Sequence, residues 1–421
     1  MKRGFLNSSK AKAKLALPEP LSAKEETPKS NKESPLGTLP FGKVKDAGIP
    51  DDYDGSSKFQ CNESHGRRTD YGPNEVVYTT IPSQDMSKPA DPDGHSECVI
   101  SGLIKAKIFN TPGYPCAIPK PRRPNMCVIK PVADMGLGVF ATCDIKVGEL
   151  IFSERPLLVT RRAMAAPTAH IPRGCSPEKV KQILMFEIEK GLQYAASRMS
   201  DERRTALMAL ANSHKEDGSG PILGIIRTNG FSIASKLGDG PAPAPGQIYP
   251  PERAYGAVCD LGSRINHSCM PNVMSSFALS SFSMQFTALR EIKAGEQLFY
   301  CYGGMFQSAA DRQKELAPYG FECKCAACVN ATPARDKLRI EFEDRVTFLV
   351  REGIRNTSDR NFLNRMLQYE KEVVAEGLDS QRIYRFMVAL IGTMQTTLGM
   401  HREAKRYLEL EKAWKEIVKQ L

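Results

Sequence analysis

Three cysteines in the last third of the chain, Cys323, Cys325 and Cys328, follow a C-x-C-x-x-C spacing. Thiolates this close together favour Zn²⁺, which prefers tetrahedral sulfur coordination. The first residues are basic but lack the apolar stretch of a secretory signal, so we expect a reducing compartment, where metal sites or free thiols are favoured over disulfides. A closed zinc site needs a fourth ligand, which the spacing alone does not identify, and free thiols remain the alternative.

Three further segments combine glycine, polar and aromatic residues in a fixed order. They are MGLGVFAT (135–142), RINHSCMPN (264–272) and GEQLFYCYG (295–303). Glycine lets a backbone approach a ligand closely, but Gly-x-Gly alone is more typical of a simple turn. A tyrosine in a strand is, by itself, more typical of packing than of catalysis. The order of the segments is therefore more informative than any one of them.

Together with YGFECKCAAC (319–328), these segments resemble the SET-domain family of protein lysine methyltransferases. The similarity covers about residues 126–328, and Asn-His-Ser-Cys-x-Pro-Asn is its most specific motif. A helical insert between two SET halves and a helical C-terminal region resemble the SET–MYND group and its fungal relatives. The paired cysteines of a MYND zinc finger are not evident in the sequence.

The resemblance implies that S-adenosylmethionine is the cofactor. The residues implied to bind it are Gly136, Leu137, Gly138, Asn266, His267, Tyr302 and Phe321. The Phe321 ring offers a flat apolar face for adenine. Met135 stands where many SET sequences have Lys or Arg, and Lys130 could substitute for that cation. Asn229, near the end of the insert, is a further candidate for the cofactor side.

The resemblance also implies a catalytic role for Tyr302 and a complete zinc site. Tyr302 matches the tyrosine that closes the second SET half, where methyl, amine and sulfonium converge. The target lysine must be neutral, and deprotonating it from a pKa of about 10.4 costs ~4 kcal/mol near neutral pH, so an apolar channel would help. The implied zinc ligands are Cys269, Cys323, Cys325 and Cys328. Cys301, beside Tyr302, is a candidate for oxidation.

The elements that must position these residues follow from changes in composition and period along the chain. Residues 1–96 are rich in Ser, Pro, Lys, Gly and Asp and are predicted to be a mostly disordered tail. The other predicted parts are pre-SET strands and a linker (97–125), a SET domain (126–303) with a helical insert (about 160–250), a zinc-binding post-SET segment (304–330) and a helical C-terminal region (334–421). In the first of these, CVISGLIKAKIF (98–109) is interpreted as strand.

The predicted fold class is therefore α+β. The resemblance implies several small, mostly antiparallel sheets and a pseudoknot, in which the C-terminal SET segment passes under a loop. The last two helices, at about 380–398 and 401–420, resemble one tetratricopeptide-type hairpin, and a helical cap on the β domain is the alternative. His170, His214 and His401 have no partner pattern and are interpreted as solvated or capping residues.

Charge and hydropathy exclude some classes of function. The net charge of +10 is spread along the 421 residues, so we expect no dedicated nucleic-acid site. The longest apolar runs are too short to cross a membrane. We expect a protein-lysine N-methyltransferase of the nucleus or cytoplasm that acts on a histone or another protein. A non-catalytic SET module that serves as a chromatin-associated scaffold is the alternative, and the sequence does not indicate an oligomeric state.

Overall fold

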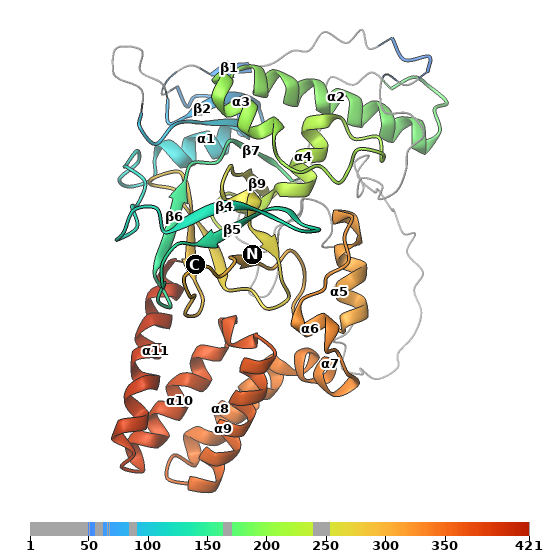
Figure 1. The fold of residues 1–421 in the computed structure, drawn as a ribbon. Coiled ribbons are helices and arrows are strands. Elements are labelled where there is room, and N and C mark those ends of the chain that lie inside the picture. Colours follow the sequence, from blue (N-terminus) through green and yellow to red (C-terminus); the bar gives the residue numbers. More distant parts are fainter. Residues whose placement is uncertain are drawn as a thin grey trace, which may run out of the picture.

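The chain is described by a computed structural model. The structure describes residues 49, 51–54, 62–64, 66, 68–83, 91–162, 171–238 and 253–420. Residues 1–48 of the predicted tail lie outside the described residues, as does the whole Pro- and Gly-rich segment 239–252. Figure 1 places sheets in the middle of the molecule, with the helices of the insert at one end and the C-terminal helices at the other.

A six-stranded mixed sheet underlies the insert. Its strands, in spatial order, are β1 (Asn62–Ser64), β2 (Val76–Ile81), β3 (Ser96–Ser101), β7 (Leu158–Arg161), β9 (Tyr255–Val258) and β8 (Phe231–Ser232). The expectation that residues up to 96 are mostly disordered is wrong for β2, which pairs along its length with β3. Its buried Val77 and Ile81 explain why: the strand joins a core whose other members come from distant parts of the chain.

The interpretation of residues 98–109 as strand is also wrong in its second half. Strand β3 ends at Ser101, and helix α1 (Gly102–Phe109) begins directly after it. The Ser101 hydroxyl accepts a hydrogen bond from the Ile104 amide at 3.2 Å, which caps the helix. Ile104 and Ile108, one helical turn apart, are fully buried. The spacing of the apolar residues in this run therefore fits a helix as well as a strand.

Three smaller sheets carry the rest of the predicted SET region. They are β11 (Val273–Ala278), β12 (Ser283–Ala288) and β6 (Leu150–Glu154); β4 (Cys127–Val132) and β5 (Gly136–Ala141); and β10 (Asn266–His267) with β13 (Phe299–Tyr300). The first two sheets are antiparallel, and β10 and β13 are parallel. The predicted α+β class with mostly antiparallel sheets is confirmed.

The helices of the insert cover the six-stranded sheet. They are α2 (Pro177–Ser197), α3 (Asp201–Met208) and α4 (Pro221–Asn229). Ser176 caps α2 by accepting a hydrogen bond from the Lys179 amide at 3.2 Å. Ile188 and Leu192 of α2 pack in one apolar cluster with Tyr78 and Val258 of the sheet.

Helices follow the last strand to the end of the described chain. They are α5 (Ala309–Leu316), η3 (Ala317–Tyr319), α6 (Ala326–Val329), α7 (Pro333–Ile340), α8 (Phe342–Arg355), α9 (Arg360–Ala375), η4 (Leu378–Ser380), α10 (Tyr384–Thr397) and α11 (His401–Gln420). The hairpin of α10 and α11 lies where the sequence predicted it. One apolar cluster joins Trp414 and Met387 of this region to Met274 of β11 and to Leu289, the residue after β12. The C-terminal region is thus docked on the β domain by burial. None of the helices in the described ranges is both long and apolar enough to cross a membrane.

Candidate functional site

Strands β10 and β13 bring the Asn-His-Ser-Cys segment beside the segment that ends in Tyr302. Asn266 pairs with Phe299 and His267 with Tyr300. Just beyond the strands, the Ser268 amide donates to the Tyr300 carbonyl at 3.1 Å. This pairing of two segments about 30 residues apart places the two motifs at one site.

Tyr302 is fixed at both its backbone and its hydroxyl. Its amide donates to His267 Nδ1 at 3.0 Å, and its hydroxyl donates to the Ile265 carbonyl at 2.8 Å. Its ring lies 5.2 Å from the His267 ring and 4.9 Å from the Tyr319 ring, between centroids. The Phe321 ring is 6.3 Å away. The rings of Tyr302, Tyr319 and Phe321 therefore form one aromatic group, and the hydroxyl of Tyr302 has a defined direction.

The same contacts determine the tautomer of His267. Because Nδ1 accepts the Tyr302 amide proton, a neutral ring carries its own proton on Nε2. His267 Nε2 lies 3.4 Å from Cys269 Sγ, so it donates to that sulfur. The ring thus connects the backbone of Tyr302 to the cysteine cluster, and both of its nitrogens are used inside the protein.

The Gly136-Leu137-Gly138 segment lies against Asn266. The Asn266 Nδ2 group donates to the Leu137 carbonyl at 3.0 Å. At Gly138 an added Cβ would lie 2.5 Å from Gln297 Nε2 and 3.1 Å from Asn266 Nδ2, so only glycine allows this close packing. Gly136 has a φ of +70°, which also favours glycine, although the space around it is open. The structure therefore brings these glycines, Asn266 and His267 together.

The surface next to this segment is apolar and exposed. Leu137 is 43% exposed, Met135 46% and Phe321 36%. Lys130 pairs across the hairpin with Gly138, and its ammonium lies 5.5 Å from the centre of the Phe140 ring. A cation is thus close to the glycines although Met135 replaces the expected one.

The four cysteines form one cluster. The sulfur atoms of Cys269, Cys323, Cys325 and Cys328 all lie within 4.8 Å of one another. Cys269 Sγ is 4.0 Å from Cys323 Sγ and 3.5 Å from Cys328 Sγ. A tetrahedral zinc ion with zinc–sulfur bonds of about 2.3 Å needs sulfur atoms about 3.8 Å apart, so the cluster fits one such ion. The separations are far longer than the ~2 Å of a disulfide.

Several other candidates from the sequence lie outside this group. Asn229 is buried, and its side-chain amide donates to the Ala211 and Ile225 carbonyls at 2.6 and 2.8 Å. The interpretation of His214 as solvated or capping is wrong, because it is buried and its Nδ1 lies 2.6 Å from Asp217 Oδ2. Burial raises the pKa of the Cys301 thiol to about 11. Cys301 is therefore a poor thiolate and a weak candidate for oxidation.

Three residues near the site were missed by sequence reasoning: Tyr319, Arg312 and Glu154. The position of Tyr319 two residues before Phe321 was the only signal for it. Arg312, on α5, has its guanidinium beside the cysteine sulfurs, and no spacing pattern indicates this. Glu154 ends β6, far in sequence from the motifs, and nothing in its local sequence indicates its partners.

Glu154 holds the turn that leads into the Asn-His segment. Its carboxylate accepts hydrogen bonds from the amides of Asp260, Leu261 and Gly262 at 3.1, 3.2 and 2.6 Å. Burial nevertheless raises the pKa of this carboxyl from 4.5 to about 7, against the effect of the amides. The folded protein therefore holds a proton on Glu154 over a pH range in which the unfolded chain has lost it.

This raised pKa predicts a pH-dependent stability. Because the folded pKa exceeds the unfolded one, the free energy of unfolding should fall as the pH rises from about 4.5 to about 7 and change no further above it. We expect a loss of about 3 kcal/mol. Glu154→Gln should abolish this part of the pH dependence in urea unfolding, and Glu291→Gln, at an exposed carboxylate, should leave it unchanged. A wild-type minus E154Q difference that is constant with pH would contradict the assignment.

The fold and the site agree with a comparison with known families. The family model described as SET domain matches residues 136–303, which contain the Gly-x-Gly segment, the Asn-His-Ser-Cys motif and Tyr302. This part of the chain is therefore similar to a SET domain.

Among curated proteins, the chain is 30% identical over 201 residues to the histone-lysine N-methyltransferase set5 of Schizosaccharomyces pombe, covering 48% of this chain and 49% of that protein. It is 39% identical over 77 residues to the histone-lysine N-methyltransferase SMYD3 of Mus musculus, 18% of each chain. It is 30% identical over 113 residues to the N-lysine methyltransferase SMYD2 of Homo sapiens, covering 27% of this chain and 23% of that one. The chain thus spans about half the length, or less, of these relatives.

Among solved structures, the Chaetomium thermophilum polycomb repressive complex 2 aligns with 65% of this chain and 33% of its own, with a TM-score of 0.21 and 13% identity. A likeness this low carries no weight for fold or function.

Proposed function

We propose that the protein is an S-adenosylmethionine-dependent protein-lysine N-methyltransferase. The observation that carries the proposal is the position of Tyr302, whose hydroxyl and backbone are both fixed beside the Asn266-His267 segment. Its support is the match of residues 136–303 to the SET-domain model and the similarity to relatives named as lysine methyltransferases.

The residues around the exposed apolar surface suit the cofactor. The proposed binding residues are Gly136, Leu137, Gly138, Asn266, His267, Tyr302 and Phe321. Glycine at 136 and 138 allows close backbone approach. His267 would contribute through its backbone, because its ring nitrogens are engaged elsewhere, and the exposed Phe321 ring would stack on an aromatic base. When bound, S-adenosylmethionine supplies a methyl group on a positively charged sulfur.

The chain's own contribution to the reaction is positioning and desolvation. The rings of Tyr302, Tyr319 and Phe321 form an apolar wall that disfavours a charged ammonium, which lowers the pKa of an inserted lysine. The Tyr302 hydroxyl has a fixed direction because the Ile265 carbonyl accepts its proton at 2.8 Å. We assign it the role of orienting the neutral amine, since alignment is the main requirement of a displacement at a methyl carbon.

The four cysteines are proposed to hold one structural Zn²⁺. A site closed by four protein ligands leaves no open position for substrate, so the metal would serve stability. Through Cys269 and His267 it would also fix the segment next to Tyr302.

The substrate is proposed to be a lysine side chain of a histone or another protein of the nucleus or cytoplasm. Purified zinc-loaded protein should transfer labelled methyl from S-adenosylmethionine to lysine in a mixture of histones and cell proteins. Self-labelling without added protein is the control. The non-catalytic scaffold remains the second candidate, because many SET features would also suit an interaction module. Calorimetry that detects no S-adenosylmethionine binding to zinc-loaded protein would favour the scaffold.

A further inference from the structure

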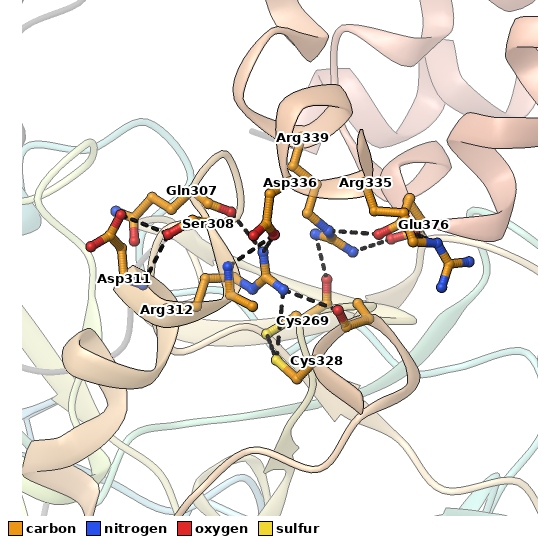
Figure 2. Close-up of polar contacts among 12 residues, drawn as sticks. Cys269, Gln307, Ser308, Asp311, Arg312, Cys328, Arg335, Asp336, Arg339 and Glu376 are labelled. Atoms are coloured by element: carbon orange, nitrogen blue, oxygen red, sulfur yellow. Dashed lines mark hydrogen bonds and ion pairs between the residues drawn. The ribbon is translucent and has the colours of Figure 1, made fainter. Parts of the chain in front are cut away.

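Two buried arginines lie side by side next to the cysteine cluster, and their charges are balanced differently. Arg339 of α7 is fully buried, and its Nε lies 2.8 Å from a carboxylate oxygen of Glu376. Arg312 of α5 is 2% exposed. Its nearest carboxylate is that of Asp336, 3.8 Å away. Figure 2 shows the Arg312 guanidinium between Asp336 and the sulfur atoms.

The other contacts of Arg312 are to neutral backbone and to sulfur. Nη1 donates to the Gln307 carbonyl at 2.6 Å, and Nη2 donates to the Ala327 carbonyl at 3.2 Å. Nη2 also lies 3.7 Å from Cys328 Sγ. The Arg312 Nε has no hydrogen-bond partner among the described residues. The sulfur cluster is therefore the closest source of negative charge for this guanidinium.

A buried cation is destabilising unless negative charge nearby offsets it. Asp336 compensates for little of this destabilisation, because its Oδ1 also accepts the Ala309 amide at 2.9 Å. Four thiolates around one divalent ion carry a net charge of about −2, which a buried site must balance. The positive charge of the Arg312 guanidinium and the negative charge of the metal-bound cysteines are opposite in sign, and the groups that carry them are in contact.

We propose that Arg312 is the counterion of the metal centre and determines how tightly the four cysteines hold Zn²⁺. This inference rests on the metal site of the proposed function, not on methyl transfer. Arg312 is a positioning residue: its charge stabilises the thiolate form of the ligands, and its hydrogen bonds to Gln307 and Ala327 hold that charge in place. Arg339 contacts the Cys269 carbonyl at 3.4 Å but has Glu376 as its own counterion.

The test is the Zn²⁺ dissociation constant, measured by competition with a chromophoric chelator on the full chain. Arg312→Gln should weaken zinc binding by about 10- to 100-fold, the range found when partners of metal ligands are removed. Arg312→Lys, which keeps the charge, should stay within about 5-fold of wild type. Arg335→Gln is the matched control, because Arg335 pairs with Glu376 at 2.7 Å in the same network without contacting a sulfur.

A second variant changes the charge near the cluster without changing the side chain of Arg312. Asp336→Asn removes the competing carboxylate but keeps an oxygen for the Ala309 amide, so zinc binding should be equal to wild type or tighter. If Arg312→Gln fails to fold, Arg312→Lys and Asp336→Asn decide the question. Equal weakening by R312Q and R312K, an unchanged R312Q, or weaker binding by D336N would each overturn the counterion role.

The absorption spectrum of the Co²⁺-substituted protein distinguishes the loss of a counterion from the loss of a metal ligand. R312Q should keep the four-sulfur Co²⁺ spectrum of wild type at saturating metal, with only the affinity reduced. A changed spectrum would mean that Arg312 shapes the ligand set and would overturn the proposal. Since no cofactor or substrate is present, these results stand whether or not the protein transfers methyl groups.

Discussion

Tyr302→Phe is expected to lower the rate of methyl transfer by about 100-fold or more, the usual effect of removing a positioned hydroxyl from a reacting centre. The ring would keep its contacts with His267 and Tyr319, because these need no hydroxyl. The lost group is the one that donates to the Ile265 carbonyl at 2.8 Å. Steady-state kinetics with a lysine-containing protein should therefore show a reduced kcat. The KM for S-adenosylmethionine should change little, because the ring of Tyr302 stays at the proposed cofactor site.

Tyr369→Phe is the matched control for this variant. Tyr369 lies on α9, and its buried hydroxyl has no hydrogen-bond partner among the described residues. Both variants lose one hydroxyl oxygen. The free energy of unfolding of Y302F should therefore fall by only about 1 kcal/mol more than that of Y369F, which is the contribution of one hydrogen bond. A Y302F protein with the wild-type rate and the wild-type ratio of mono-, di- and trimethylated products would remove Tyr302 from its proposed role.

The elements that sequence reasoning predicted correctly are those whose signals are local. The segment Lys-Val-Gly-Glu at 146–149 carries such a signal, because glycine there is typical of a tight turn; the Glu149 amide donates to the Lys146 carbonyl at 3.1 Å, and Gly148 has a φ of +77°. Helices α10 and α11 lie within a few residues of their predicted bounds, because apolar residues repeat with a helical period and Gly399 interrupts them. Each of these signals is contained in no more than 20 residues.

The six-stranded sheet could not be predicted in the same way. Strand β2 is stable because β3 lies on one side of it, and β3 is stable because β7, some 60 residues further along, pairs with it in parallel. Non-local pairing of this kind leaves no local period, so a short strand flanked by Pro, Gly and Asp looks like part of a tail. The missed cap of α1 has a different cause. Ser101 is a local signal for the start of a helix, but the apolar run around it was interpreted as a strand.

The residues of the candidate site also differ in whether their signal is local. The cysteines and the Asn-His pair carry specific spacings, whereas Arg312 and Glu154 act through partners from other segments. Glu154 binds three amides that follow it by more than 100 residues. Charge balance in a buried site depends on every segment packed there, so it is seen only once the fold is known.

Cys323→Ser is expected to abolish stoichiometric zinc binding and to lower the stability of the whole site. Serine is a poor ligand for zinc in a sulfur site, and the three remaining cysteines could no longer close a four-sulfur site. Because binding to the folded state contributes its free energy to folding, we expect the melting temperature to fall by about 10 °C or more, which corresponds to a loss of several kcal/mol. Metal content by elemental analysis and thermal unfolding by circular dichroism measure both effects.

The consequence for the reaction follows from Cys269, which is both a proposed ligand and a neighbour of His267. Without the metal, the contact between His267 Nε2 and Cys269 Sγ at 3.4 Å loses its fixed anchor, so the segment beside Tyr302 should become less protected from hydrogen exchange. Cys116→Ser, at an exposed cysteine outside the cluster, should keep full zinc content, stability and exchange protection. Treatment of the wild type with a strong chelator should reproduce the C323S result, and added Zn²⁺ should reverse it in the wild type alone. A C323S protein that retains one zinc ion and the wild-type exchange pattern would show that the four cysteines are free thiols.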